Sequence, residues 1–306
     1  MNRHDFLKST LLGGVAAVLG GEELQAQSPA PCDMAAVLGG APDEMLKKAL
    51  EMMGGISRFV KKGQKVTIKP NIAWNRTPER AGNTNPLLVA ELVRLCIQAG
   101  ASSVTVFDHT CDEWRRCYET SGVEEAARKA GAKVVSGNDE RLYREVAIPG
   151  GKVLKRAKIH EAILDSDVWF NVPVLKHHGG AQLTISMKNY MGLVWDRRFF
   201  HRNDLQQCIA DICLLKPRPA LNIVDAYRVL KDHGPQGRSD ADVVLAKGLF
   251  VSPDIIAVDT AALRFFNQIR KMSLESVTHI TNGELLGLGT TDLKKVKILR
   301  EKMSET

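Results

Sequence analysis

The feature that most constrains the fold is an alternation of short β-branched runs with amphipathic helices in the first half of the chain. The run at 65–69, Lys-Val-Thr-Ile-Lys, predicts a strand. A helix is expected at 86–98, because Pro86 opens it and Gly100 follows its end. Two more strands are expected at 104–108 and 132–135, and a helix at 123–130. Strands joined by crossover helices run parallel, so this pattern predicts an α/β fold.

The second half of the chain continues the pattern less regularly. Strands are expected at 167–175, 220–225 and 243–251, and helices at 44–59, 204–215 and 254–269. No internal repeat is visible. The prediction is a three-layer α/β fold, with a mostly parallel sheet between flanking helices. We expect one α/β domain over 44–306, arranged either as a single body or as two lobes meeting near the middle of the chain.

Composition excludes several classes of protein. With 44% hydrophobic residues in 306, the chain can bury a large core and is not a disordered protein. The mean hydropathy of −0.14 predicts no membrane-spanning segment in the mature chain. Six cysteines are too few for a disulfide scaffold. They form no Cys-x-x-Cys motif, so no iron–sulfur cluster is predicted, although Cys111 with Cys117, and Cys208 with Cys213, lie close enough to pair in an exported protein.

Positive charge is concentrated in one stretch of the chain. The net charge of +7 comes without any nucleic-acid-binding motif, so no nucleic-acid partner is predicted. Between 176 and 202 there is one acid, Asp196, against five Lys or Arg and three His residues. They are Lys176, Lys188, Arg197, Arg198, Arg202, His177, His178 and His201. This stretch is either a solvated face or a pocket for a small anionic ligand.

The first residues have the composition of an export signal. A basic start, a short apolar stretch at 11–20 and small residues near Ala26 predict a signal over 1–26, followed by a linker over 27–43. The start resembles a twin-arginine signal, in which His4 replaces the second arginine. The alternatives are cleavage near Ala26 and an uncleaved amphipathic anchor. We expect a periplasmic or otherwise exported protein, with the twin-arginine system as its route.

Polar residues stand where the predicted strands end, which is where open α/β sheets bind ligands. The segment 83–85 precedes a helix and either caps it or receives a phosphate or carboxylate at its start. No glycine-rich dinucleotide or P-loop motif is present, so the cofactor is left unidentified. The residues predicted to bind a ligand or cofactor are Lys69, Asn71, Asn83, Thr84, Asn85 and Asp108.

Two further segments carry the residue types of catalytic sites. His177 and His178, next to two glycines, suit either proton transfer or a divalent-metal site. Lys188 interrupts an apolar stretch and needs a partner, which would be Asp225, Asp259 or a bound anion. A solvated lysine on a helix face is the alternative. The predicted catalytic residues are Lys176, His177, His178, Lys188, Asn189 and Asp225, and the predicted metal ligands are His177 and His178.

Taken together, these motifs resemble the domain-of-unknown-function family DUF362. The resemblance extends over roughly 65–288 and rests on Ile68-Lys69-Pro70-Asn71, Asn83-Thr84-Asn85-Pro86, Asp108, Lys176-His177-His178, the segment 187–192 and Asp225. It implies an α/β domain that is often exported and sometimes fused to ferredoxin-type modules. The chain is also remotely similar to lactate-racemase-like proteins, which hold a nickel-pincer nucleotide through lysine and histidine; His178 and Lys188 are the matching residue types.

The hypothesis from sequence is an exported enzyme of redox or isomerase type. It would bind an anionic substrate or cofactor in a cleft lined by Lys, His and Asn side chains. His177 or His178 would move a proton or hold a metal, Lys188 would hold developing negative charge, and Asp225 would balance a cation. The alternative is a non-catalytic periplasmic binding protein that uses the same cleft. The oligomeric state is left open.

Overall fold

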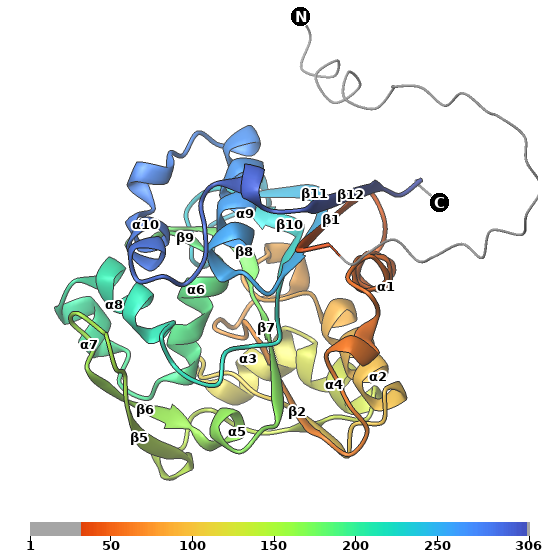
Figure 1. The fold of residues 1–306 in the computed structure, drawn as a ribbon, viewed down its shortest axis with the longest axis horizontal. Helices are drawn as coiled ribbons and strands as arrows, with labels where there is room; N and C mark the ends of the chain where they lie inside the picture. The colour runs from red at the N-terminus through yellow and green to blue at the C-terminus, as the bar shows by residue number, and fades with distance from the viewer. Residues whose placement is uncertain (1–31, 305–306) are drawn as a thin grey trace, which may run out of the picture. The chain divides into compact units, whose positions relative to one another are not determined.

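A large mixed sheet forms the centre of the protein (Figure 1). The structure, a computed structural model, describes residues 32–304. Across the sheet the strands are β12 (Ile298–Lys302), β1 (Met34–Leu38), β11 (Val243–Ser252), β10 (Leu221–Leu230), β7 (Val168–Val172), β2 (Lys65–Pro70), β3 (Ser103–Val106) and β4 (Lys133–Val134), with β8 (Val174–His178) beside β10 and β9 (Gln182–Thr184) beside β8. A separate antiparallel hairpin pairs β5 (Tyr143–Ala147) with β6 (Arg156–His160).

The strand directions confirm the predicted α/β class with a mostly parallel sheet. The run from β10 through β7, β2 and β3 to β4 is parallel throughout. Antiparallel pairs occur where β11 meets β1 and β10, and where β9 meets β8. The helices are α1 (Pro42–Met52), α2 (Pro86–Gln98), α3 (Trp114–Thr120), α4 (Val123–Lys129), α5 (Glu161–Leu164), α6 (Ser186–Asn189), α7 (Arg198–Arg202), α8 (Leu205–Ile212), α9 (Ile255–Ile269) and α10 (Thr278–Leu285).

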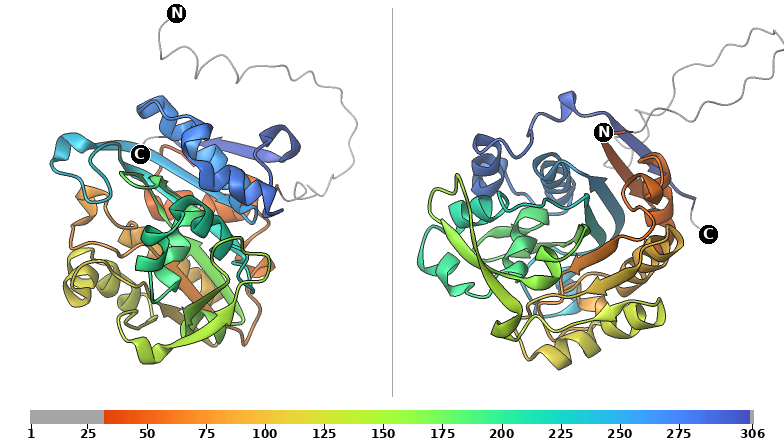
Figure 2. Two further views of the ribbon diagram at one scale, coloured as in Figure 1. Left: turned by 90° about the vertical axis from the view of Figure 1, so that its left-hand side faces the viewer. Right: turned by 60° about the horizontal axis from the view of Figure 1, so that its bottom comes forward.

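Two hydrophobic cores lie on opposite faces of the sheet. Helices pack on both faces and give the predicted three layers (Figure 2). Because strand side chains alternate, one strand supplies both cores. Ile223 of β10 packs into the core that contains α1, α2 and α4, and its neighbour Val224 packs into the core that contains α8, α9 and α10. The described residues form one compact unit rather than two lobes.

Helix α2 shows how local sequence signals set an element boundary. Asn85 accepts a hydrogen bond from the Leu87 amide at 3.0 Å and so caps the helix. Pro86 occupies the first helical position, where its missing N–H costs nothing. The helix therefore begins at the residue that the sequence predicted.

The chain near residue 27–43 differs from the linker that was expected there. Met34–Leu38 forms β1, which pairs with β11 on one side and with β12 on the other. The apolar run Met-Ala-Ala-Val-Leu has two long-range partners that local sequence reasoning does not reveal. The α/β domain therefore starts before residue 44, while the predicted export signal at 1–26 lies outside the described residues.

The strand expected at 167–175 is two strands. Pro173 interrupts it, and its carbonyl accepts the amide of Asp225 at 2.9 Å. The chain resumes as β8, so Lys176, His177 and His178 lie within a strand rather than beyond its end. Proline cannot donate a hydrogen bond to a neighbouring strand, which explains the break at this position.

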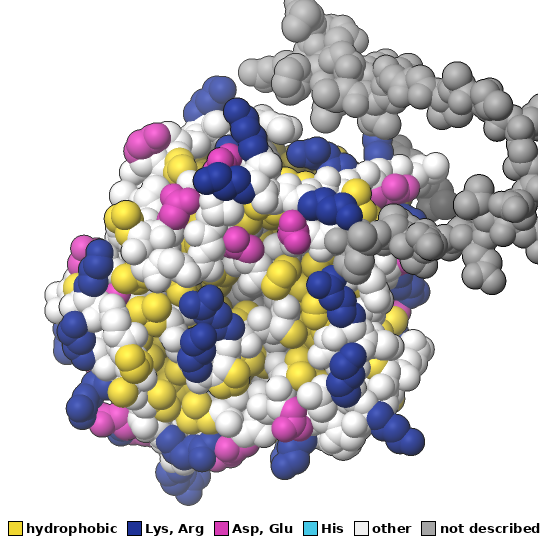
Figure 3. Space-filling model, viewed as in Figure 1, with side chains coloured by type: hydrophobic (Ala, Val, Ile, Leu, Met, Phe, Trp, Pro, Cys, Tyr) yellow, Lys and Arg dark blue, Asp and Glu magenta, His cyan; other side chains and the backbone are white. Residues whose placement is uncertain are grey.

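The cysteines form no disulfides among the described residues. All six are free thiols, including Cys111 and Cys117, and Cys208 and Cys213, which lie close in sequence. Among residues 32–304, no helix has the length and apolar character needed to cross a membrane. On the face drawn in Figure 3, Lys and Arg side chains are spread over the surface among hydrophobic and neutral ones.

Candidate functional site

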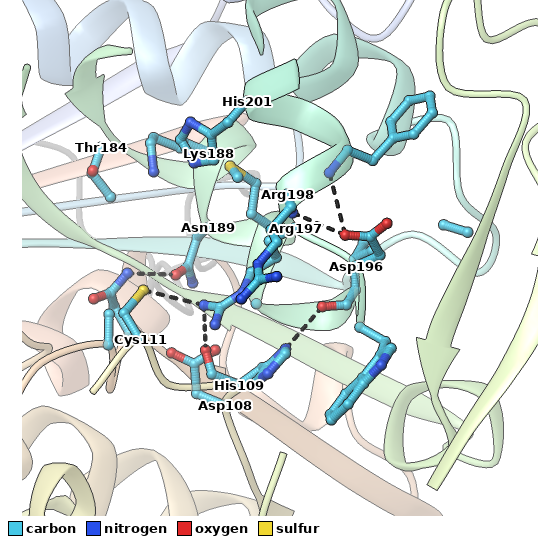
Figure 4. A pocket seen from close by; sticks show the side chains of 18 of the residues that line it. Asp108, His109, Cys111, Thr184, Lys188, Asn189, Asp196, Arg197, Arg198 and His201 are labelled. Atoms are coloured by element: carbon cyan, nitrogen blue, oxygen red, sulfur yellow. Dashed lines mark hydrogen bonds between the residues drawn. The ribbon is translucent and has the colours of Figure 1, made fainter. Parts of the chain in front are cut away.

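A cavity of about 970 Å³ opens where β2 and β3 end, and α6 and the segment leading into α7 complete its wall. Figure 4 shows side chains from these separate segments pointing toward one space. The hairpin β5–β6 contributes Glu145, Arg156 and Lys158. Of the twelve residues predicted from sequence, the seven that line this cavity are Lys69, Asn71, Asp108, Lys176, His178, Lys188 and Asn189.

A buried ion pair forms the floor of the cavity. Lys69 Nζ lies 2.8 Å from Asp108 Oδ1, and both side chains are almost fully buried. Lys69 also donates to Asn189 Oδ1 at 2.8 Å, and the other Asp108 oxygen accepts the Ile72 amide at 2.6 Å. Burial lowers the pKa of Lys69, and Asp108 opposes that effect. Neither group of this pair is left without a partner.

The polar network continues from this pair through two asparagines. Asn189 Oδ1 also accepts from Asn71 Nδ2 at 3.0 Å, and Asn71 Oδ1 accepts from Lys176 Nζ at 3.2 Å. Lys176 donates a second hydrogen bond to the carbonyl of Gly82. Side chains that line the cavity therefore connect the end of strand β2 to strand β8 and to helix α6.

Gly192 explains why the motif at 187–192 ends in glycine. A Cβ atom at this position would lie 2.0 Å from Asp108 Oδ1 and 2.6 Å from Lys69 Nζ. Any larger residue would therefore displace the buried ion pair. The glycine lets the backbone pass directly over the charged floor of the cavity.

Helix α6 is fixed by a carboxylate at its start. Asp259, on α9, accepts the amides of Ser186 and Met187, each at 2.9 Å. Burial raises the pKa of Asp259 to about 7. This contact positions the helix that carries Lys188 and Asn189.

Lys188 has no hydrogen-bond or ion-pair partner among the described residues, although it faces the cavity. The two carboxylates that the sequence offered as partners are used elsewhere. Asp259 holds the amides at the start of α6, and Asp225 accepts the amides of Asn85 at 2.7 Å and Tyr227 at 3.0 Å. A bound anion is the one sequence-predicted partner that the geometry leaves.

Two cavity lysines have pKa values near neutrality. Burial, together with the charge of Lys188, lowers the pKa of Lys176 to about 7. Burial lowers the pKa of Lys188 to about 8, with Arg197 and Lys69 adding to the effect. Each amine therefore exchanges its proton at a pH close to neutrality.

Most carboxylates in the wall already have partners. Glu145 pairs with Arg156, Glu140 pairs with Lys158, and Asp108 pairs with Lys69. Asp196 accepts amides at the start of α7. The cations lining the cavity that no carboxylate of the described chain neutralises are Lys176, Lys188, Arg197 and Arg198.

Several cavity residues were missed as individual site residues. Arg197 donates to the carbonyls of His109 and Thr110 and lies 3.2 Å from Cys111 Sγ. In Figure 4 its guanidinium group points toward Cys111 and His109. The signal for Arg197, Arg198 and His201 was the cationic stretch at 176–202, which predicted an anion pocket without ranking its members. Arg202 does not line the cavity.

Aromatic residues around His109 gave no signal in the sequence. The His109 ring stacks on Trp195 with centroids 5.1 Å apart, and its Nδ1 lies 2.9 Å from the Val194 carbonyl. Burial lowers the pKa of His109 to about 4, so the ring is neutral at physiological pH. Trp74 also lines the cavity. These rings give one side of the wall an apolar surface.

Four predicted site residues have structural contacts outside the cavity. Asn83 binds the backbone at Trp74 and Arg76, and Thr84 Oγ1 joins Asn71 to the Val172 carbonyl. Asn85 caps α2, and Asp225 accepts the amide of Asn85 itself. Both oxygens of Asp225 accept backbone amides, so the geometry does not support the expectation that Asp225 balances a cation in the cavity.

The two histidines do not act as a pair. His177 Nδ1 accepts the Gly234 amide at 3.0 Å and does not line the cavity. His178 Nδ1 accepts the amides of Gly180 and Ala181, at 3.1 and 3.0 Å. Adjacent strand residues point to opposite faces, which explains the separation.

The same hydrogen bonds determine what the imidazoles can do. An Nδ1 that accepts requires hydrogen on Nε2, so each ring offers a donor rather than a metal lone pair. Burial lowers the pKa of His178 to about 2, which keeps it neutral. The residues fit a divalent metal poorly, and residues 32–304 contain no group of three or more His, Cys, Asp or Glu side chains that could hold one.

Comparison with known proteins places the chain in a family. Residues 66–264 match the family described as "Domain of unknown function (DUF362)". The chain belongs to DUF362. This confirms the resemblance seen in the motifs. A thylakoid-associated protein of Synechocystis sp. is similar to this chain. The two are 24% identical over 254 residues, which cover 80% of this chain and 75% of that protein.

Two solved structures align with this DUF362 chain at lower sequence identity. The lactate racemase apoprotein from Thermoanaerobacterium thermosaccharolyticum aligns with a TM-score of 0.49 and 13% identity, over 78% of this chain and 57% of that one. A Thermotoga maritima protein aligns with a TM-score of 0.39 and 12% identity, over 76% and 59%. The chain thus spans less than two thirds of the length of either structure.

Proposed function

We propose that this DUF362 protein is an isomerase-type enzyme that binds a small organic anion in the cavity and moves a proton on it. The observation that carries the proposal is Lys188, a cavity-facing ammonium group with no carboxylate partner. Arg197 and Lys176 line the same cavity, and the charges of the three groups act on one another. A carboxylate or phosphate bound here would neutralise cations that the chain itself leaves unpaired.

The two lysine pKa values support proton transfer as the chemistry of the site. With pKa values of about 7 and about 8, Lys176 and Lys188 reach a state near neutrality in which one amine is neutral and the other is charged. The neutral amine would take a proton from a carbon next to a carbonyl or carboxylate group. The electron pair of that C–H bond moves onto the carbonyl oxygen, where the charged amine and Arg197 stabilise it.

The reaction is completed when a proton returns to the substrate. Return from the other side of the carbon, or to a neighbouring atom, gives an isomer with no net gain or loss of electrons. His178, with hydrogen on Nε2, would orient the ligand as a hydrogen-bond donor. Asn71 and Asn189 would fix the amines through the network that joins them.

The test uses solvent deuterium. Short 2-hydroxy and 2-keto carboxylates would be incubated with the protein in D₂O, and loss of the C–H signal would be followed by NMR. The wild-type protein should exchange deuterium into at least one of them. Lys188→Met should reduce exchange by roughly 100-fold or more, while its melting temperature stays at or above that of the wild type.

A matched control separates this effect from loss of charge. Lys271 is exposed and lies outside the cavity, so Lys271→Met should exchange normally. Ligand-induced stabilisation without deuterium exchange would favour the non-catalytic binding protein. Unfolding of Lys188→Met would assign the lysine a structural role and overturn the proposal.

Export is the remaining part of the proposal. The composition of residues 1–26 supports transport by the twin-arginine route. Fractionation of the native host should find the protein outside the cytoplasm. Lysine replacement of Arg3 should leave it inside, and normal export of that variant would count against this route.

A further inference from the structure

A second, smaller cavity lies at the opposite end of the sheet from β3 and β4. Its volume is about 340 Å³, and it is a partly open hollow bordered by β1, β11, β12, α9 and the 3-10 helix Leu293–Lys295. Figure 1 shows α9 lying against this end of the sheet. None of the residues that line it lines the larger cavity, so it is a separate site.

Small side chains on facing elements create the space. Ala36 of β1 sits between Phe250 and Arg300, its partners on the two neighbouring strands. Ala261 and Phe265 lie one helical turn apart on α9 and also line the cavity. With alanine on both the strand and the helix, the two layers do not fill the volume between them.

The wall of this cavity is both apolar and positively charged. Met34, Phe250 and Phe265 are among its hydrophobic side chains, and no Asp or Glu lines it. The cations in its wall are Arg264, Lys294 and Arg300. All three are exposed, and none forms an ion pair within residues 32–304. An apolar hollow under three unneutralised cations complements a molecule with a hydrocarbon tail and an anionic head.

We propose that this cavity binds a medium-chain fatty acid. The tail would occupy the space beside Ala36 and Ala261, and the carboxylate would lie at Arg264, Lys294 and Arg300. The volume is at the lower end of the range of about 300–1,000 Å³ for small-molecule sites, which fits one short acyl chain. The proposal does not depend on the function of the larger cavity.

Isothermal titration calorimetry with decanoate, below its micelle concentration, tests the binding. Decanoate should bind at one site per chain. Decanol, which has the same tail and no charge, should bind at least tenfold more weakly, and acetate should not bind. From octanoate to decanoate, affinity should rise about fourfold per added methylene group, the change expected for burying apolar surface.

Variants locate the site. Ala261→Leu fills the hollow without adding charge and should abolish decanoate binding, and Ala36→Leu should do the same from the strand side. The triple variant Arg264→Gln, Lys294→Gln, Arg300→Gln should weaken binding at least tenfold. Lys271→Gln, an exposed cation elsewhere, is the matched control and should bind as the wild type does.

Three results would overturn the proposal. These are equal binding of decanol and decanoate, wild-type affinity in both folded leucine variants, and loss of decanoate binding in Lys188→Met. The last would place the fatty acid in the larger cavity. Circular dichroism melting of each variant shows that it is folded, and either leucine variant alone is sufficient for the test.

Discussion

Two polar regions of this protein differ in whether their charged side chain has a complete set of hydrogen-bond partners. Around Asp225, both carboxylate oxygens accept backbone amides, and the region lies outside the cavity. Around Lys188, the ammonium group faces the cavity and no side chain of the described residues accepts its hydrogens. Burial of a charge is costly unless it is paired. The complete set of partners at Asp225 indicates a structural role, and the missing partner at Lys188 is the reason that we propose a ligand there.

The largest effect is expected at the floor of the cavity, where pairing is complete. Lys69→Met leaves the buried Asp108 carboxylate without its cation and should lower the free energy of unfolding by about 3–5 kcal/mol. Urea unfolding measures this change. The double variant Lys69→Met, Asp108→Asn should recover most of the loss, because no unpaired charge remains. A loss below about 1 kcal/mol in the single variant would show that the pair is not stabilising.

Asp225 should behave as a purely structural residue. Asp225→Ala removes the acceptor of two buried amides and should lower the free energy of unfolding by about 1–3 kcal/mol. Ligand-induced stabilisation should persist in this variant, since Asp225 does not line the cavity. Thermal melts with and without ligand make the comparison. A variant that folds but is no longer stabilised by ligand would show that Asp225 has a role in ligand binding.

The pH dependence of anion binding should identify the lysines. As pH rises through about 7 and about 8, Lys176 and Lys188 lose their protons, so affinity for an anion should fall by roughly tenfold or more. The unliganded protein should respond with the opposite sign. Between pH 8 and the ordinary lysine value of 10.5, the unfolded chain holds a proton that folded Lys188 lacks, so the free energy of unfolding rises with pH.

Replacement of one lysine sharpens this comparison. Lys188→Arg keeps its charge throughout, so the fall in affinity near pH 8 should disappear and the one near pH 7 should remain. Titration calorimetry across the range provides the measurement. An unchanged profile in this variant would mean that the titrating group is another residue.

The smallest effect is expected at Cys111. It is the one exposed cysteine of the six, so iodoacetamide should modify a single thiol in the folded protein. Cys111→Ser should change the free energy of unfolding by less than about 0.5 kcal/mol. Because Cys111 lines the cavity, alkylation should still block ligand binding. Intact-protein mass spectrometry counts the modified thiols, and bound ligand should slow the reaction.

Prediction from sequence succeeded where short-range signals determine structure. The proline, the cap and the following glycine place α2 at Pro86–Gln98, as predicted. It failed where partners are distant in sequence. Strand β1 is stabilised by pairing with β11 and β12, and β5, the first strand of the short hairpin, shows no alternation of polar and apolar residues.

Prediction of the site residues also depended on whether a short-range signal was present. Residue type and position at strand ends found Lys69 and Asp108, because parallel strands bring their carboxyl ends together. The same reasoning included Asp225, since a sequence does not show that a carboxylate will face backbone amides. His177 was included because its chemistry resembles that of His178, although one residue along a strand reverses the direction of the side chain.

The pairing of β1 also has a consequence for biosynthesis. Both of its neighbours, β11 and β12, come from the last quarter of the chain, so the ribosome must make more than two hundred further residues before either is available. Until then, Met34–Leu38 is an apolar segment with open hydrogen-bonding edges. During translation this segment is therefore where a chaperone would be needed most, and the sheet is completed only when synthesis is nearly over.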